Sequence, residues 1–158
     1  MNISKNYINK NHANQICDIF LSNMFPWYYI PNHVDKESVS YMSHTFFKDG
    51  QATSNAMFLV EPILKKLKVK NILNVRANLC FKRPSKFIWH VDKFTDNLNH
   101  KTAIYYVNTN NGCTEFKDKK VKCEKNKIVI FDSKIKHRAK IQTDTDTRMV
   151  INFNYEYI

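Results

Sequence analysis

The sequence predicts a single, mainly β domain with helices in its N-terminal part, folded as a sandwich or jelly roll. Three observations predict this class. The chain has 158 residues, a length at which one domain buries about two-thirds of its unfolded surface and forms a core without disulfides. No internal repeat, low-complexity tract or Pro/Gly-rich linker divides it. Near residue 70 the pattern changes from helical spacing to short β-rich runs separated by polar turns.

Residues 1–69 are expected to form a helical support region. A first helix before the Phe25-Pro26 break is indicated by apolar residues at helical spacing: Ile16, Ile19 and Phe20. A second helix follows Ser54, its expected cap. Its apolar face consists of Phe58, Leu59, Ile63, Leu64 and Leu67. Pro62 is compatible with this helix if it lies in the first turns.

Residues 70–158 are expected to form the β core, so that the whole chain, 1–158, is one domain. The core consists of the runs 71–82, 86–91, 101–108, 113–116, 127–132, 135–142 and 147–157. Short runs at this close spacing are typical of a jelly roll, with the N-terminal helices packed on one sheet. The mouth of such a roll is open, and we expect the functional site there.

The formal charge of +11 raises the possibility of a nucleic-acid partner, because lysine and arginine neutralise phosphates. The composition favours a simpler origin for this charge. Arginine occurs only at positions 76, 83, 138 and 148, the other basic residues are lysines, and the chain has just 2 glycines. This is the profile of an AT-rich genome, and the lysines form no stripe interleaved with aromatics. We therefore expect no specific nucleic-acid partner.

The cysteines and the apolar residues bear on location. Cys17, Cys80, Cys113 and Cys123 form no CxxC pair and have no zinc-ligand spacing, which favours free thiols in a reduced compartment. No stretch approaches the ~20 apolar residues that span a bilayer, and the first residues lack the apolar run of a secretory signal. We expect a cytoplasmic monomer or homodimer without a membrane partner.

The strongest local signal is His90-Val91-Asp92. On a strand, residues i and i+2 point to the same face, so the imidazole and the carboxylate converge. A second histidine would complete a two-histidine, one-carboxylate site, which suits iron(II) because it leaves coordination positions open. His137 fits, because it follows the apolar run 127–131 and a short turn, where an antiparallel return brings it beside the first pair.

The last run strengthens this interpretation because its two faces are unlike. Arg148 lies 11 residues after His137 and begins the run. One face is apolar and consists of Met149, Ile151, Phe153 and Tyr155. The other consists of Arg148, Val150, Asn152 and Asn154, and is too polar for a core, so we expect it to face a cavity. A guanidinium there predicts a carboxylate ligand.

Other candidate ligands are weaker. A lone histidine is more often structural or solvent-facing than a ligand, and this is expected for His12, His33, His44 and His100. Asp96 and Asp132 have no histidine two residues away, and turn capping accounts for both.

Five blocks in order resemble one family. They are 90–92, 102–108, 111–116, 128–132 before His137, and Thr147-Arg148 leading the last run. Together they resemble the prolyl-4-hydroxylase-like group of iron(II)/2-oxoglutarate oxygenases, and within it the small enzymes encoded by phages and some bacteria. The segment 25–29 is similar to the N-terminal region of the phage members, so the resemblance covers most of the chain.

The resemblance implies a double-stranded β-helix, a jelly roll of the cupin-like kind. It implies that His90, Asp92 and His137 ligate Fe(II), and that Arg148 binds the distal carboxylate of 2-oxoglutarate. Such an enzyme uses O2 and converts 2-oxoglutarate to succinate while hydroxylating a substrate.

The resemblance also implies further contacts with the cosubstrate. Tyr106 matches a tyrosine that donates to the carboxylate held by the arginine. Where relatives often have another tyrosine, before the HxD motif, this chain has Asn78, which we expect to take its place. Asn152, on the inward face of the last run, is expected to contact the cosubstrate as well.

The substrate and two other classes of function stay open at this point. A peptidyl proline is favoured by analogy, and other side chains, free amino acids and small metabolites are alternatives. A nucleic-acid base dioxygenase would have a second arginine six residues after the first, where this chain has Asn154. A non-catalytic cupin-like metal- or ligand-binding module would not need Arg148.

Overall fold

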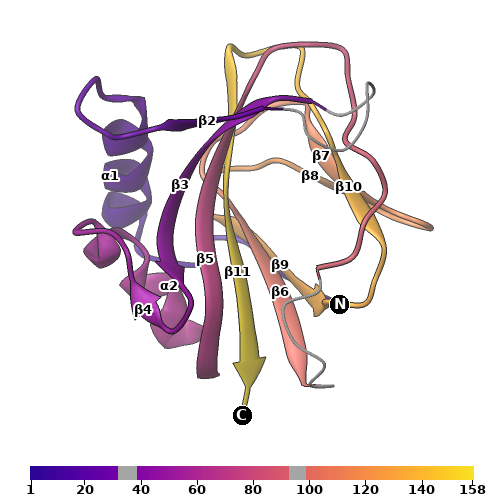
Figure 1. Cartoon of the computed structure of the whole chain (residues 1–158). Helices are drawn as coiled ribbons and strands as arrows, with labels where there is room; N and C mark the ends of the chain where they lie inside the picture. The colour runs from indigo at the N-terminus through magenta and orange to yellow at the C-terminus, as the bar shows by residue number, and fades with distance from the viewer. Residues whose placement is uncertain (32–38, 93–98) are drawn as a thin grey trace.

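A computed structural model describes residues 1–31, 39–92 and 99–158 of the chain. Two antiparallel sheets face each other, and the helices cover the outer side of the larger one (Figure 1). In the described residues no helix is both long enough and apolar enough to cross a membrane.

Eight strands of the described chain form the larger sheet. Its order is β1 (Asn2–Ser4), β9 (Lys127–Asp132), β6 (His100–Tyr106), β11 (Thr147–Tyr157), β5 (Val69–Phe81), β3 (Tyr41–Lys48) and β2 (Tyr28–Ile30), with β4 (Gln51–Ala52) paired to β3. The smaller sheet has the order β10 (His137–Lys140), β7 (Cys113–Phe116) and β8 (Lys120–Lys122). This is the double-stranded β-helix expected from the resemblance.

The helices pack on one face of the larger sheet. Helix α1 (Lys10–Leu21) begins after Asn9, whose side chain accepts a hydrogen bond from the Asn11 amide, and buries Ile16 and Phe20. The short helix η1 (Met57–Leu59) leads into α2 (Glu61–Lys66). Pro62 lies in the first turn of α2, where its missing N–H has no helical partner to lose.

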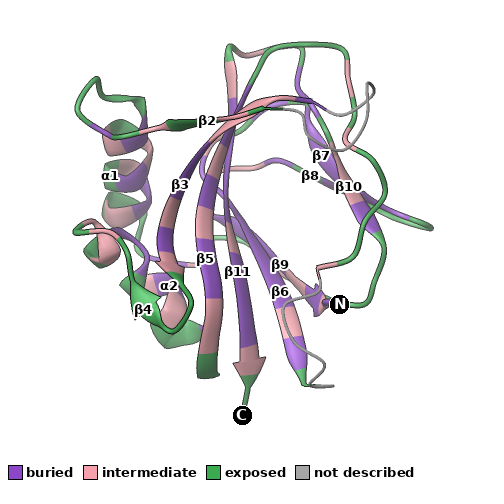
Figure 2. Ribbon diagram, in the orientation of Figure 1, coloured by how far each residue is buried: buried purple, intermediate pink, exposed green. Residues whose placement is uncertain are grey.

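The two faces of β5 and β11 differ, as the sequence pattern of residues 148–155 predicted for the last strand. The side facing the helices is the main apolar core, with Val75, Ala77 and Leu79 from β5 and Met149, Ile151 and Phe153 from β11. Figure 2 shows buried residues along the middle of both strands, whereas the end of β5 is exposed. The opposite face of β5 and β11 carries polar side chains and looks toward the smaller sheet. Its register pairs Cys80 with Arg148, Asn78 with Val150, Arg76 with Asn152, and Asn74 with Asn154.

The expectation of a helical support region over residues 1–69 is correct only in part. Both helices are present, but β1 to β4 also come from this region, and β3 pairs directly with β5. Three of these strands span only two or three residues, too short for a periodic pattern. Ser54 does not cap α2, because its hydroxyl accepts a hydrogen bond from the Ala56 amide in a turn and contacts His44 Nε2 at 2.8 Å.

Two details of the predicted β core also change. The run 86–91 is no continuous strand, and reaches β10 through isolated bridges from Lys86 to Lys140 and from His90 to His137. Strand β8 was not predicted. It is short, lies at the edge of the smaller sheet, and alternates exposed lysines with the buried Val121.

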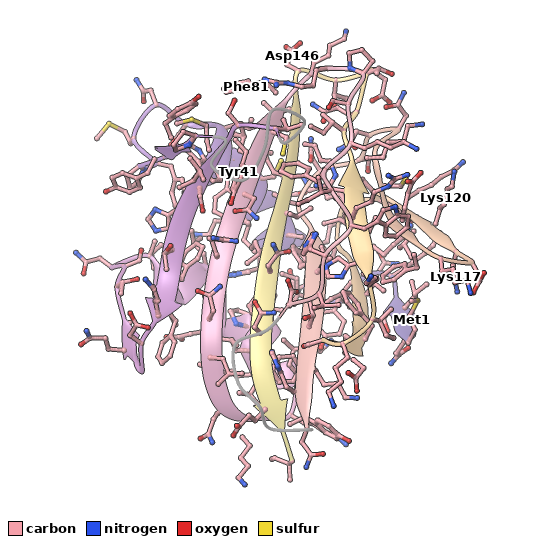
Figure 3. All side chains as sticks on the ribbon, turned by 45° about the vertical axis from the view of Figure 1, so that its right-hand side comes forward. Met1, Tyr41, Phe81, Lys117, Lys120 and Asp146 are labelled. Carbon is pink, nitrogen blue, oxygen red and sulfur yellow. The ribbon has the colours of Figure 1, made fainter. Side chains whose placement is uncertain are left out.

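The smaller sheet is stabilised by one buried carboxylate. Glu115 in β7 pairs with Arg138 Nε at 2.8 Å, Lys120 Nζ at 3.3 Å and Lys86 Nζ at 3.4 Å. Lys120 is labelled in Figure 3 at the outer edge of the molecule. Burial raises the pKa of Glu115, but the hydrogen bonds from the three cations outweigh it and lower the pKa to about 2. Glu115 thus joins β10, β8 and the segment before His90.

Replacing Glu115 by Gln should lower the free energy of unfolding at pH 7 by about 2 kcal/mol, the range for hydrogen bonds to a charged group. Because the folded pKa is depressed from 4.5 to about 2, this stabilisation is complete above pH 4.5 and is lost as the pH falls toward 2. Urea denaturation of both proteins across this range measures the effect. A difference between them that stays constant down to pH 2 would contradict this account.

Candidate metal centre

His90, Asp92 and His137 come together at one end of the space between the sheets. One ligand atom from each lies within 4.8 Å of the others, and no other such group of three His, Cys, Asp or Glu residues occurs in the described residues. Each histidine Nε2 lies 3.8 Å from a different oxygen of Asp92. The sequence-predicted triad is therefore one cluster in space.

Backbone pairing positions the two histidines. His90 N–H donates to the His137 carbonyl at 3.0 Å, and His137 N–H donates back at 2.9 Å, so the residues lie directly opposite each other. The Asp92 amide donates to the Ser133 carbonyl at 3.1 Å, which fixes the turn after the bridge. The sequence predicted that an antiparallel return would bring His137 beside His90. In the structure the two residues do pair in this way, through one isolated bridge.

The protonation of both rings suits metal binding. Nδ1 of His90 lies 3.1 Å from the Ile88 carbonyl, and Nδ1 of His137 lies 3.0 Å from the Ile135 carbonyl. A carbonyl can only accept, so each Nδ1 carries a proton, and in the neutral ring this leaves the Nε2 lone pair available to a metal. Burial lowers the pKa of His137, against the opposing effect of Asp92, and favours the neutral ring. Two neutral imidazoles and a carboxylate are a donor set for a divalent transition metal.

Asp92 is oriented by side chains that the sequence did not single out. Its Oδ2 accepts hydrogen bonds from Thr102 Oγ1 at 2.8 Å and from Asn154 Nδ2 at 3.2 Å. Asn154 also donates to Thr102 Oγ1 at 3.0 Å, and Ser133 Oγ lies 2.9 Å from the same hydroxyl. Thr102 and Asn154 are cross-strand neighbours on β6 and β11. Their pairing brings both donors to the carboxylate.

Replacing Asn154 by Ala should weaken metal binding about 10- to 100-fold, the range for partners that orient metal ligands. The amide is buried and donates to the Asp92 carboxylate, so its loss leaves Asp92 less well held. Competition titration with a metal indicator measures the affinity. Asn71→Ala, an exposed amide bonded to Glu156, is the matched control. Equal metal affinity in the two variants would show that Asn154 does not position Asp92.

Arg148 lines the same cavity, which has a volume of about 300 Å³. The residue is 3 % exposed, and its Nε donates to Cys123 Sγ at 3.2 Å. No ion pair joins it to a carboxylate of the described chain. Gly112 makes room for it, since a Cβ there would lie 3.1 Å from Arg148 Cδ and 3.0 Å from the Lys140 carbonyl oxygen. A buried guanidinium without an anionic partner is a site for an anion.

The other three predicted cosubstrate contacts differ in their placement. Asn78 and Asn152 line the cavity, as expected for inward residues of β5 and β11. Asn78 Oδ1 lies 3.1 Å from Ser43 Oγ, which donates to it, whereas Asn152 Oδ1 is buried without a hydrogen-bond partner. Tyr106 is fully buried, and its hydroxyl donates to Thr114 Oγ1 at 2.7 Å. Thr114 lines the cavity in front of it.

The weaker candidates among the described residues are not part of the cluster. His12 Nε2 contacts the Leu59 carbonyl. His44 lies on β3, is buried, and packs against the Phe25 ring. His100 is buried at the start of β6. Asp132 accepts a hydrogen bond from the Lys134 amide, which is the turn capping expected for it. His33 and Asp96 lie outside the described residues.

The fold and this site define a class: jelly-roll proteins with a two-histidine, one-carboxylate cluster at the end of a cavity. Residues 77–156, half of the chain, match the 2OG-Fe(II) oxygenase superfamily, and the chain belongs to this family. It is thus an oxidoreductase that uses Fe(II), 2-oxoglutarate and O2, which confirms the cofactors and the oxygenase activity predicted from the sequence.

Solved structures share the fold at low sequence identity. A prolyl-4-hydroxylase of Pseudomonas putida matches with TM-score 0.64 and 12 % identity, over 99 % of this chain and 92 % of that one. A viral collagen prolyl hydroxylase of Paramecium bursaria Chlorella virus-1, in complex with 2-oxoglutarate, matches with TM-score 0.64 and 11 % identity over 99 % and 95 %. A 2OG-Fe(II) oxygenase of Burkholderia pseudomallei gives TM-score 0.71 and 9 % identity over 97 % and 82 %. No curated protein matches the chain in sequence.

Proposed function

We propose that this oxygenase is a hydroxylase in which His90, Asp92 and His137 hold the iron and Arg148 binds the distal carboxylate of 2-oxoglutarate. The observation that carries the proposal is one cavity with both groups in its wall. The three metal-donor residues line it, and so does a buried arginine that pairs with no carboxylate of the described chain. A dicarboxylate can bridge the two, since one end can reach the metal and the other the guanidinium.

The chain's own residues supply positioning and exclude water. The two imidazoles present Nε2 to the metal, and Thr102 and Asn154 hold Asp92 Oδ2 so that the carboxylate keeps one orientation. Ile104 and Val150 line the cavity and provide apolar surface around the cosubstrate. When bound, iron and 2-oxoglutarate supply the oxidative chemistry, in which O2 delivers one oxygen atom to the substrate and one to succinate, with release of CO2.

The roles of the remaining predicted residues are part of the proposal. Asn78 and Asn152 would direct their amide N–H groups at the cosubstrate. Tyr106 would act on it through Thr114, to which its hydroxyl donates, since Thr114 stands between Tyr106 and the cavity. Asn154 occupies the position where a base dioxygenase would have a second arginine, and its amide donates to Asp92. This supports a substrate other than a nucleic-acid base.

The substrate is a peptide side chain or a small molecule. Prolyl hydroxylases are among the proteins that share the fold, and one of them, from Trichoplax adhaerens, is in complex with a peptide fragment. That likeness supports a peptidyl prolyl substrate by analogy only.

The experiment is the anaerobic addition of Fe(II) and 2-oxoglutarate to the purified protein. Because the metal and the cosubstrate share one cavity, both together should give a weak visible charge-transfer band that neither gives alone. 2-Oxoglutarate should also raise the melting temperature more with metal than without it. Absence of both the band and the stabilisation would refute the proposed site.

A further inference from the structure

The cavity contains a second arginine that the proposed function does not use. Arg76 lies on β5, opposite Asn152 of β11 on one side and Thr45 of β3 on the other. It lines the main cavity and also a second pocket, whose other lining residues come from β2, β3 and Thr53. Arg76 is thus the residue that the two pockets have in common.

Arg76 has no anionic partner in the described chain. Among the described residues, its Nε is buried without a hydrogen-bond partner, and no carboxylate forms an ion pair with it. Asp92 is the one acidic residue among the described residues that line the two cavities. That carboxylate is already held by Thr102 and Asn154 beside the histidines. A partly desolvated guanidinium without a counter-charge is costly, so its site favours an anion from solution.

The cosubstrate does not meet this need. One carboxylate of 2-oxoglutarate lies at the metal in the proposed function, and the other lies at Arg148. Its two negative charges balance a divalent metal together with Asp92 and Arg148, which leaves the charge of Arg76 uncompensated. The register also separates the two arginines, because Arg76 is four residues along β5 from Cys80, the partner of Arg148. Four residues of a strand span roughly 13 Å.

A neighbouring acceptor is also unsatisfied. Asn152 is the cross-strand partner of Arg76, and its Oδ1 is buried without a hydrogen-bond partner. An acceptor beside a cation suits a ligand that carries a carboxylate and, next to it, an N–H or O–H donor. Part of the cavity wall is aromatic, since Tyr41, which Figure 3 labels, packs its ring 5.7 Å from that of Phe87, and both line the cavity.

We propose that Arg76 binds a carboxylate of the primary substrate, and that this substrate is a small amino or hydroxy acid whose donor group reaches Asn152 Oδ1. The inference rests on the proposed function. A small acid fits because the cavity, of about 300 Å³, must hold the cosubstrate as well. The acid presents its carboxylate to Arg76 and its chain to the metal end.

The test measures succinate release by the iron-loaded enzyme in the presence of free amino acids and short 2-hydroxy acids. Each acid is compared with its primary amide, which lacks the carboxylate. At least one acid should stimulate succinate release, and its amide should not. Arg76→Gln should raise KM for that acid by about 30-fold or more, the fold-change for truncating one partner of a buried charge pair. Arg76→Lys, which keeps a point charge but not the planar fork, should recover part of this loss.

Binding measurements separate the proposed role of Arg76 from that of Arg148. The acid is titrated calorimetrically into protein loaded with Mn(II) and 2-oxoglutarate, and 2-oxoglutarate into protein loaded with Mn(II) alone. Arg76→Gln should weaken the first binding and not the second, and Arg83→Gln, an exposed arginine, should change neither. Equal responses to acids and amides, no response to any acid, or a loss of 2-oxoglutarate affinity in Arg76→Gln would each overturn the inference. A wild type that binds no 2-oxoglutarate would instead refute the proposed function on which it rests.

Discussion

Replacing His137 by Ala should lower the affinity for Fe(II) by more than about 100-fold, because even residues that only orient metal ligands contribute 10- to 100-fold. His137 is the most buried of the three proposed ligands, and its Nε2 lies 3.8 Å from Asp92. Without it, two protein ligands are left. The affinity for 2-oxoglutarate should fall as well, since the cosubstrate binds through the metal, and succinate release should stop at every cosubstrate concentration.

Competition titration with Fe(II) or Co(II) under nitrogen measures this effect. The His137 ring also packs against Phe131 and Phe116, so the alanine variant could lose stability for a second reason. His137→Gln fills more of the space and still lacks the imidazole, and it should lose metal to a similar extent while melting closer to the wild type. Metal affinity near that of the wild type in the Gln variant would remove His137 from the proposed site.

The β core and the cluster of His90, Asp92 and His137 were predictable from the sequence because each has a local sequence pattern. In 148–155 every second residue is apolar and packs toward the helices, whereas Arg148, Val150 and Asn152 between them line the cavity. His90-Val91-Asp92 is a tripeptide, and its partner His137 follows a recognisable strand and turn. Such features need no knowledge of how distant strands align.

Features that depend on register could not be predicted in this way. Thr102 and Asn154 meet at Asp92 only because β6 and β11 pair at this position. Arg76 gave no signal in the sequence, since its cavity is formed by β5 with strands from both ends of the chain. A one-residue change of register would turn each side chain to the opposite face, so no single segment carries this information.

The N-terminal strands were missed for a different reason. Strand β3 is rich in aromatic and β-branched residues, but it lies between two helices whose apolar spacing dominates the region. The segment forms a strand because it pairs with β5. Ser43 lies on the same face of the sheet as Asn78, to whose Oδ1 it donates a hydrogen bond. Tertiary pairing therefore decided the structure of this segment, as is common for strands.

Replacing Arg148 by Met should leave metal binding intact and weaken 2-oxoglutarate binding by roughly 2 to 5 kcal/mol, the range for truncating one partner of a buried charge pair. This corresponds to a loss of affinity of about 30-fold to several thousand-fold. Methionine keeps much of the bulk beside Gly112 and Cys123 but offers no donor to a carboxylate. Succinate release should collapse at ordinary 2-oxoglutarate concentrations and recover in part when the concentration is raised, because the proposed iron ligands are unchanged. The His137→Ala protein should show no such recovery.

Calorimetric titration of Mn(II)-loaded protein with 2-oxoglutarate measures the affinity directly, and Arg83→Met serves as the control because that arginine is exposed. The two arginines of the cavity make the outcome decisive. If Arg148 holds the distal carboxylate, its loss weakens 2-oxoglutarate and the loss of Arg76 does not. If Arg148→Met binds 2-oxoglutarate as the wild type does, the buried guanidinium is not the anchor. If Arg76→Gln then lost 2-oxoglutarate affinity instead, the cosubstrate carboxylate would be assigned to Arg76 on β5 and not to Arg148 on β11. Arg148 would then need another anion to account for its burial.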